Sequence, residues 1–341
     1  MLRKRKRIRL LALFCLFTLL AAGCGSPTKN EETAQSSTPV SYRLKWLFNA
    51  STAGDLWAKE KGLFANYGLK VTVKEGGAEQ DAIEELELGR VQFGVASADQ
   101  VLRAVSRGAD VLVLAQIFQI NPLQWIYMKS RVDLEGLDKG ALKQKLPHLT
   151  VGITYGGNDE AIFMALVKSL GLEPESLNIY AITYDYTPFW KGEVDLWPCY
   201  RNTQGITLSE KMKEMGDKPG FLNPADYGIS FVANSLITTK RFAKRHPETV
   251  KLFTKCILEA WHQALMPENR KEMVSILERY EKTISPSSIS KQLEATRELV
   301  TDHGQREIGY IDQNAWAQTE DVMFQQGLIK KRVDVTKLFM K

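Results

Sequence analysis

The stretch Leu44–Leu69, LKWLFNASTAGDLWAKEKGLFANYGL, decides the predicted fold. It begins with a short apolar run, Leu44–Phe48, and breaks at residues 49–52, which are typical of turns and helix N-caps. A helical pattern then follows and stops at a glycine. A strand that leads directly into a helix exposes backbone N–H groups at the carboxyl end of a sheet, where open α/β proteins bind small molecules. We therefore expect Trp46 and Asn49 to face a ligand at this edge.

Beyond this stretch, apolar strand-like runs alternate with helical patterns. The strand-like runs are residues 69–73, 92–95, 111–118, 125–129, 150–153, 177–182, 194–196 and 229–238. The helical patterns are residues 79–88, 97–106, 161–170, 247–266, 268–280, 285–300 and 313–327. This alternation predicts the α/β class, with mainly parallel sheets flanked by helices.

Glycine pairs at 76–77 and 156–157 each open a predicted helix, which indicates two similar lobes. We expect residues 42–124 together with 232–341 to form the first lobe, and residues 125–231 to form the second. Two lobes that are joined by two extended crossings make a hinged cleft for a ligand.

The N-terminus has the pattern of a bacterial lipoprotein signal. Residues 1–23 have a basic head and an apolar run, and they end in Leu-Ala-Ala-Gly before Cys24, the expected lipidation site. The alternative is a transmembrane anchor, but the apolar run is shorter than the roughly 20 residues that a membrane-spanning helix needs. Residues 24–41 are small and polar, and we expect them to form a flexible tether.

The charge of the chain changes when this leader is set aside. Six of the 45 basic residues lie in the first nine positions, which leaves 39 basic against 40 acidic residues, a net charge of −1. A nearly neutral chain gives no electrostatic reason to expect a nucleic acid as partner. Two cysteines remain, Cys199 and Cys256; we favour free thiols, and a disulfide between them is the alternative.

Four turns are expected to converge on the cleft: residues 49–55, 76–81, 97–99 and 155–160. Each opens a predicted helix and can offer N–H groups to a ligand, among them those of Gly156 and Gly157. Each also carries its own acid and no Lys or Arg. A multiply charged anion such as phosphate or sulfate is therefore not expected, and the alternative is that these residues only cap helices.

Aromatic residues crowd the predicted strand ends, among them Tyr155, Tyr186, Trp197 and Tyr200. Aromatic side chains with polar groups suit a flat heteroaromatic ligand, because the rings stack and the polar groups bind its edges. Asp195 either accepts a hydrogen bond from such a ligand or only caps a turn.

Catalytic and metal sites have little support. The four histidines, at 148, 246, 262 and 303, are dispersed, and the sequence has no His-x-x-His, Cys-x-x-Cys, Gly-x-Ser-x-Gly or P-loop motif. We expect no catalytic residue, no metal and no cofactor.

The chain resembles the substrate-binding proteins of ABC importers, in the group that binds thiamine pyrimidine precursors, with sulfonate and nitrate binders as more distant relatives. The resemblance rests on LKWLFN at 44–49, AKEKGLF at 58–64, YGLKV at 67–71, LGRVQFGVASADQ at 88–100 and GEVD at 192–195. The pyrimidine-binding pattern of the group is Trp-x-x-Asn-x-x-His. Trp46 and Asn49 match this pattern, and Thr52 stands at the position of the histidine.

This resemblance implies a two-lobed type II periplasmic-binding-protein fold that closes on its ligand and presents it to a membrane permease. Together with the residues above, it gives the expected ligand-binding set: Trp46, Asn49, Thr52, Ser97, Asn121, Tyr155, Gly156, Gly157, Tyr186, Asp195, Trp197 and Tyr200.

We therefore expect a monomeric, non-catalytic, lipid-anchored receptor outside the cytoplasm that binds a thiamine pyrimidine precursor or a similar heteroaromatic. The alternatives are a pyrimidine-precursor synthase of the same fold, a sulfonate binder, and a surface protein that kept the fold without a ligand.

Overall fold

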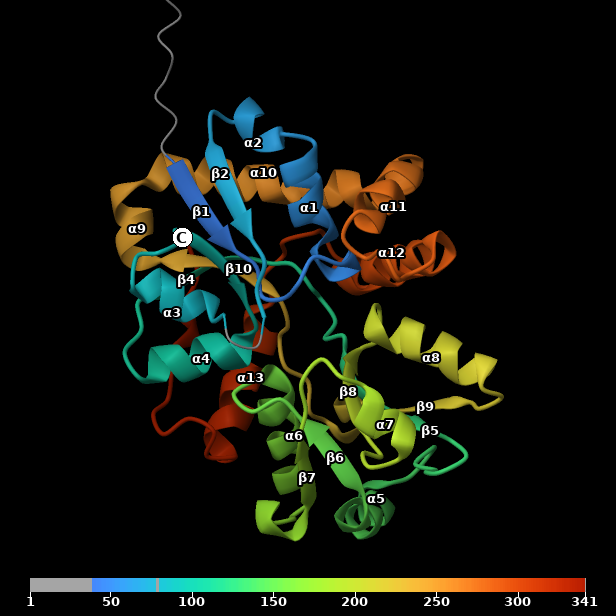
Figure 1. The fold of residues 1–341 in the computed structure, drawn as a ribbon. Coiled ribbons are helices and arrows are strands. Elements are labelled where there is room, and N and C mark those ends of the chain that lie inside the picture. Colours follow the sequence, from blue (N-terminus) through green and yellow to red (C-terminus); the bar gives the residue numbers. More distant parts are fainter. Residues whose placement is uncertain (1–38, 78–79, 341) are drawn as a thin grey trace, which may run out of the picture. The chain divides into compact units, whose positions relative to one another are not determined.

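The computed structural model describes residues 39–77 and 80–340 (Figure 1). The chain divides into two units after Ser36, and every described residue belongs to the second unit, Ser37–Lys341. The predicted signal peptide, Cys24 and the tether up to residue 38 lie outside the described residues. Within the described ranges, no helix has the length and apolar character needed to cross a membrane.

The first sheet has five strands in the order β2-β1-β3-β10-β4. The strands are β1 (Pro39–Arg43), β2 (Lys70–Lys74), β3 (Phe93–Ala96), β4 (Val111–Gln116) and β10 (Ser235–Thr239). β1 is parallel to β2 and β3, with Pro39 opposite Lys70 and Tyr42 opposite Phe93. β10 is antiparallel to both of its neighbours, β3 and β4.

The other strands repeat this order. They are β5 (Leu123–Met128), β6 (Thr150–Ile153), β7 (Asn178–Ala181), β8 (Trp197–Tyr200) and β9 (Pro219–Leu222). β5 pairs antiparallel with β8 and β9, β6 pairs parallel with β7, and a parallel bridge between Val151 and Leu196 joins the two groups. The resulting order is β7-β6-β8-β5-β9, and it matches the order of the first sheet strand for strand. β7, β6, β8, β5 and β9 hold the places of β2, β1, β3, β10 and β4, respectively. The α/β class is confirmed, with mixed sheets.

Thirteen α-helices accompany the described strands (Figure 1). They are α1 (Ala53–Glu60), α2 (Leu63–Asn66), α3 (Ala82–Glu87), α4 (Ala98–Ser106), α5 (Lys139–Lys145), α6 (Asn158–Ser169), α7 (Thr187–Lys191), α8 (Gln204–Glu214), α9 (Lys240–Arg245), α10 (Pro247–Leu265), α11 (Arg270–Glu278), α12 (Pro286–Thr301) and α13 (Gln313–Gln325). Capping residues determine where several of these helices begin. The Ser285 hydroxyl accepts from the Ser288 N–H before Pro286, and Asp312 caps α13 in the same manner.

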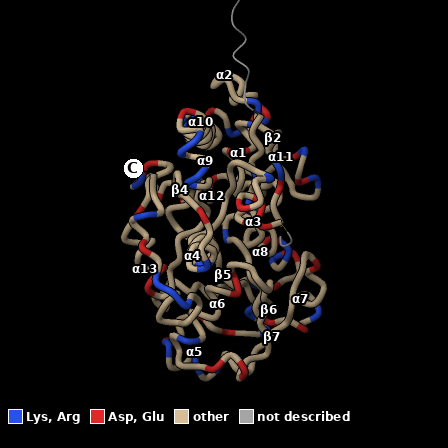
Figure 2. The backbone as a smooth tube through the Cα atoms, turned by 90° about the vertical axis from the view of Figure 1, so that its left-hand side faces the viewer, with Lys and Arg blue, Asp and Glu red and all other residues tan. Residues whose placement is uncertain are grey.

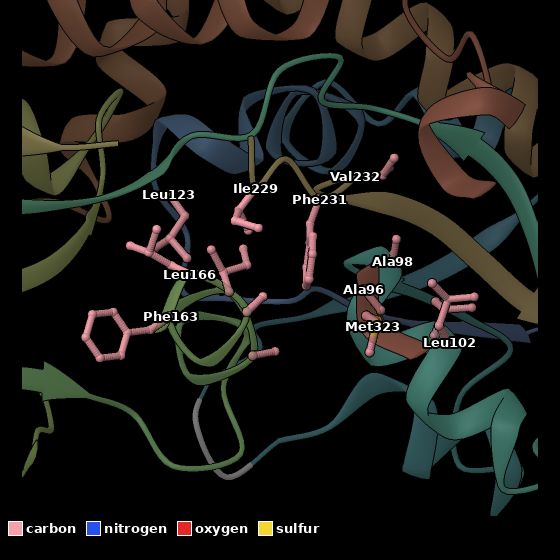
Figure 3. Close-up of a cluster of buried hydrophobic side chains, with 14 of the residues drawn as sticks. Ala96, Ala98, Leu102, Leu123, Phe163, Leu166, Ile229, Phe231, Val232 and Met323 are labelled. Atoms are coloured by element: carbon pink, nitrogen blue, oxygen red, sulfur yellow. The ribbon is translucent and has the colours of Figure 1, made fainter. Parts of the chain in front are cut away.

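Two segments connect the sheets, residues 117–122 and 229–234, and we call them the crossings. The Asn121 side chain donates to the Phe231 carbonyl at 2.9 Å and accepts from the Leu123 N–H at 2.9 Å, so it links one crossing to the other. One apolar cluster includes residues of both sheets and their helices (Figure 3). Leu166 of α6, Phe231 of the second crossing and Leu102 of α4 all belong to it. Burying such side chains contributes roughly 1.5–3 kcal/mol each.

Several predicted elements begin elsewhere. The first strand, Pro39–Arg43, begins inside the tether predicted at residues 24–41 and ends beyond it, while residues 44–49 form a bent loop. Buried and less buried residues alternate in this strand, but only two of its residues, Val40 and Tyr42, are buried. The sequence pattern was therefore too short to mark a strand. Gly76 and Gly77 do not open a helix: α3 begins at Ala82, because the Asp81 carboxylate accepts from the Ile83 N–H at 2.7 Å. The predicted strand at 194–196 is a single bridge at Leu196, followed by β8.

Candidate functional site

A cavity of about 640 Å³ lies where β1 and β6 end. Both sheets contribute to its wall. We call the part built on the sheet β2-β1-β3-β10-β4 the first half and the part built on β7-β6-β8-β5-β9 the second half. The first half contributes the loop after β1 and residues 280–284 between α11 and α12. The second half contributes the turn after β6, residues 182–184, Tyr186 and β8. A space of this size accommodates a small organic ligand.

The loop after β1 forms one wall and is held by its own polar groups. The Asn49 side-chain oxygen accepts from the Ser51 N–H at 2.8 Å, and the Thr52 hydroxyl donates to the Asn49 carbonyl at 2.9 Å. Both side chains are buried and line the cavity. They therefore cap the helical turn Ala50–Thr52 as well as facing the cavity.

Two aromatic pairs line the cavity. Trp46 lies against Tyr184 with ring centroids 5.6 Å apart and planes at 42°, and Tyr186 lies against Trp197 at 5.3 Å and 47°. The first pair joins the loop after β1 to the loop after β7, so it joins the two halves. The prediction omitted Tyr184 from the site, although its aromatic neighbours at 186 and 197 were included.

A lysine also lies in this wall. Lys45 Nζ donates to the Tyr200 hydroxyl at 2.7 Å, and the Tyr200 hydroxyl donates to Asn234 Oδ1 at 3.4 Å. This chain of contacts links the loop after β1, β8 and the second crossing. Lys45 precedes the turn at residues 49–55, which contains no Lys or Arg, so a cation in this wall was not predicted.

Five carboxylates line the cavity against two lysines, Lys45 and Lys282; the carboxylates are Asp55, Glu75, Asp81, Asp159 and Glu281. Burial raises the pKa of Asp55 to about 7, although the Tyr42 hydroxyl donates to it at 2.7 Å and partly offsets this effect. Burial also raises the pKa of Asp159 to about 6, although the hydrogen bond from the Thr154 N–H lowers this pKa in part. Burial raises the pKa of Glu281 to about 7.

The cavity includes eight of the twelve residues predicted to bind ligand: Trp46, Asn49, Thr52, Gly156, Gly157, Tyr186, Trp197 and Tyr200. The two glycine N–H groups are not offered to it, because Gly156 donates to Glu160 Oε2 at 2.8 Å and Gly157 to the Thr154 carbonyl at 2.9 Å.

The other four predicted residues do not line the cavity. Ser97 is buried and bonded to Gln100, and Asn121 links the crossings. Asp195 accepts from the Thr150 N–H at 2.8 Å, which fixes it to β6, and Tyr155 is 65% exposed. A one-residue shift along a strand or turn reverses the direction of a side chain, and sequence patterns do not resolve such shifts.

The two cysteines that the structure describes are unpaired: Cys199, which lines the cavity, and Cys256 in α10 are both buried free thiols. Burial raises the pKa of both thiols, that of Cys256 to about 12. Across the described residues, no group of three or more His, Cys, Asp and Glu side chains is placed to hold a metal ion.

Comparison with known proteins identifies the family. Residues 49–269 match the model of the "NMT1/THI5 like" family, and the chain belongs to it. The chain is 23% identical to the riboflavin-binding protein RibY of Chloroflexus aurantiacus, over 98% of this chain and 97% of that protein. It is 24% identical to the 4-amino-5-hydroxymethyl-2-methylpyrimidine phosphate synthase THI13 of Saccharomyces cerevisiae, over 66% of each.

The fold is similar to that of solved binding proteins. The alkanesulfonate-binding protein SsuA of Xanthomonas axonopodis pv. citri, solved with bound MOPS, superposes with a TM-score of 0.67 at 17% identity, over 89% of this chain and 98% of that one. At this identity the similarity establishes the periplasmic-binding-protein fold and not the ligand.

Proposed function

We propose that this protein is a non-catalytic receptor of an ABC importer, anchored outside the cytoplasm through lipid on Cys24, and that it delivers a small heteroaromatic molecule to a membrane permease. The observation that carries the proposal is the cavity wall: two aromatic pairs, from both halves of the chain, in a space with more carboxylates than lysines. Rings stack on such pairs, and the amide of Asn49 and the carboxylates bind polar edges.

The charges of the wall favour a neutral or weakly basic ligand. A sulfonate or nitrate would meet five carboxyl groups in this wall against two lysines, and Lys45 donates one of its three N–H groups to Tyr200. Glu281 Oε2 is buried and lacks a hydrogen-bond partner among the described residues. An N–H group of a ligand would satisfy this oxygen, since a buried acceptor without a partner costs about 1–3 kcal/mol.

The cavity volume favours a ligand larger than one ring. About 640 Å³ exceeds what a single substituted pyrimidine fills, and drug-sized ligands occupy sites of this order. A thiamine pyrimidine precursor and a fused-ring vitamin such as a flavin are therefore both candidates. The second is favoured by volume and by the relative named as a riboflavin-binding protein.

Ligand capture in this proposal is a movement of two lobes, residues 42–124 with 232–341 and residues 125–231. Trp46 and Lys45 contribute from the first lobe, and Tyr184 and Tyr200 from the second. A ligand that touches both lobes shifts the equilibrium toward the closed form, and the permease binds that form.

The second candidate is an enzyme, because one relative is named as a pyrimidine phosphate synthase. The position of the histidine in the family's pyrimidine-binding pattern is Thr52 here, and its hydroxyl is bonded to the Asn49 carbonyl. A hydroxyl that is held in a cap does not titrate near neutral pH, so it does not replace an imidazole as an acid or base.

Native mass spectrometry of the purified protein tests the proposal. We expect a co-purified heteroaromatic molecule. Adding it back in hundredfold excess over its Kd should stabilise the protein by about 2.7 kcal/mol. Recovery of a sulfonate or other small anion would refute the heteroaromatic ligand. Turnover of the recovered molecule, or consumption of added pyridoxal phosphate, would refute the non-catalytic role. If no candidate molecule changes the thermal stability, the protein is no receptor.

A further inference from the structure

A basic hollow of about 380 Å³ lies away from the ligand cavity, where α4 ends and α9 begins. Five cationic side chains and one carboxylate, Asp334, line it; the cations are Arg107, Lys240, Lys331, Arg332 and Lys337. The hollow shares no lining residue with the ligand cavity.

The charges of this hollow are only partly neutralised. Arg332 pairs with Glu320 and Asp321, and Lys337 pairs with Asp334. Arg107, Lys240 and Lys331 form no ion pair with any described carboxylate, and α9 adds the exposed side chains of Arg241, Lys244 and Arg245. The acids next to α9 are few: Asp110, which accepts from the Arg241 N–H, and Glu248. Figure 2 shows lysine and arginine positions on α9, beside β4.

The sheet places these charges at the edge opposite the ligand cavity. The last residue of β10, Thr239, pairs with the first residue of β4, Val111, and α9 follows directly. β1, β2, β3 and β4 are parallel to one another, so they all start at this edge, whereas the cavity lies at their carboxyl ends. The described chain also enters at this edge, at Pro39.

We propose that the surface formed by α9, Arg107 and residues 331–337 contacts the anionic headgroups of a lipid bilayer. Exposed lysines and arginines are attracted to anionic lipid within a Debye length of the membrane. A polybasic surface and an acyl anchor act together, because each alone gives weaker attachment. This inference goes beyond the proposed function, although it shares the membrane location. In this orientation the ligand cavity faces away from the bilayer, so the basic surface must release the headgroups before the receptor delivers its ligand to a permease in the membrane.

Vesicle co-sedimentation tests this surface without the lipid anchor. The chain from residue 37 suits the experiment, because residues 37–341 form a compact unit by themselves. We expect this chain to sediment with vesicles that contain phosphatidylglycerol, to remain in solution with pure phosphatidylcholine, and to be released by salt. The triple variant Lys240→Glu, Lys244→Glu and Lys331→Glu should lower the partition coefficient at least about tenfold.

The matched control reverses three exposed lysines elsewhere, Lys139→Glu, Lys143→Glu and Lys213→Glu, with the same change in net charge. The control should keep most of the vesicle binding, and both variants should keep the stabilisation by the recovered ligand. Equal loss in the two variants, or equal binding to neutral vesicles, would overturn the proposal. Release by inorganic phosphate, but not by chloride at equal ionic strength, would assign the hollow to a free anion and also overturn it.

Discussion

The loop after β1 and the turn after β6 hold equivalent places in two sheets of the same strand order, yet they offer different chemistry to the cavity. The first is long, leaves Trp46 against the partner half and sends Lys45 across to Tyr200. The second is short, and its glycine N–H groups are used by Glu160 and Thr154. An equivalent position in the fold therefore gives access to the cavity, but the groups that face it depend on which hydrogen-bonding groups the local turn leaves unused.

The close packing behind the first loop should give the largest loss of stability. A Cβ atom added at Gly54 would lie 2.1 Å from Cγ of Trp261, a buried side chain of α10. We expect Gly54→Ala to lower the free energy of unfolding by about 3 kcal/mol, because neither helix can move without disturbing the core. Urea denaturation measures this, and a loss under about 1 kcal/mol would show that the Trp261 ring has room to shift.

Asp55 and Asp159, two buried carboxyl groups of the cavity wall, should destabilise the fold over different pH ranges. A folded-state pKa above the unfolded value makes the native state bind more protons, so stability falls as pH rises through the interval between them. For Asp55 the interval runs from about 4 to about 7, and for Asp159 from about 4 to about 6. Asp55→Asn should therefore gain stability relative to the parent by about 2–4 kcal/mol between the ends of its interval.

Unfolding curves for Asp55→Asn and Asp159→Asn at several pH values check this prediction. Asparagine keeps an oxygen that can accept from Tyr42 or from the Thr154 N–H. The advantage of Asp159→Asn should stop growing about one pH unit earlier than that of Asp55→Asn. A constant difference between parent and variant across this range would contradict the raised pKa of the carboxyl concerned.

Ligand affinity should separate Trp46 from Tyr155, the exposed aromatic of the second turn. Trp46→Ala should weaken binding of the recovered ligand about tenfold, because loss of one stacked ring costs roughly 1–3 kcal/mol. Tyr155→Ala is the control, since this side chain is 65% exposed and does not line the cavity. Isothermal titration measures both, and unchanged affinity in Trp46→Ala would remove Trp46 from the site.

The smallest effect is expected at Gly156 in the second turn. Its φ of 77° lies in the left-handed region, but a Cβ atom there would meet no other atom within 4 Å. Gly156→Ala should therefore cost only about 1 kcal/mol of backbone strain. Urea denaturation alongside Gly54→Ala tests the contrast, and equal losses would mean that backbone conformation, not packing, controls both positions.

The sequence predicted those features that are determined by residues adjacent to one another in the chain. Helices with clear caps, such as α12 after Ser285-Pro286, lie within one residue of their predicted starts. The α/β class followed from the alternation of strand-like and helical patterns, and eight residues of the predicted ligand-binding set line the cavity. Glu281 could not be predicted, because it reaches the cavity only through long-range packing of a loop that carries no local signal, whereas Tyr184 stands at a strand end among aromatics that were predicted and was left out of the set. The start of α3 was wrong because the Gly-Gly pair resembles a helix entry, while the Asp81 carboxylate five residues later forms the actual cap.

The two buried thiols make the molecule convenient for distance measurement. Alkylating dyes react with the thiolate, which is the nucleophilic form, and burial raises the pKa of both Cys199 and Cys256 and so keeps them as thiols. A chain from residue 37 contains no other cysteine. Cysteines placed at exposed Asn66 and Lys139 would accept a dye pair without background from the native residues, and energy transfer between the dyes would then follow how far apart the two halves stand, with and without ligand.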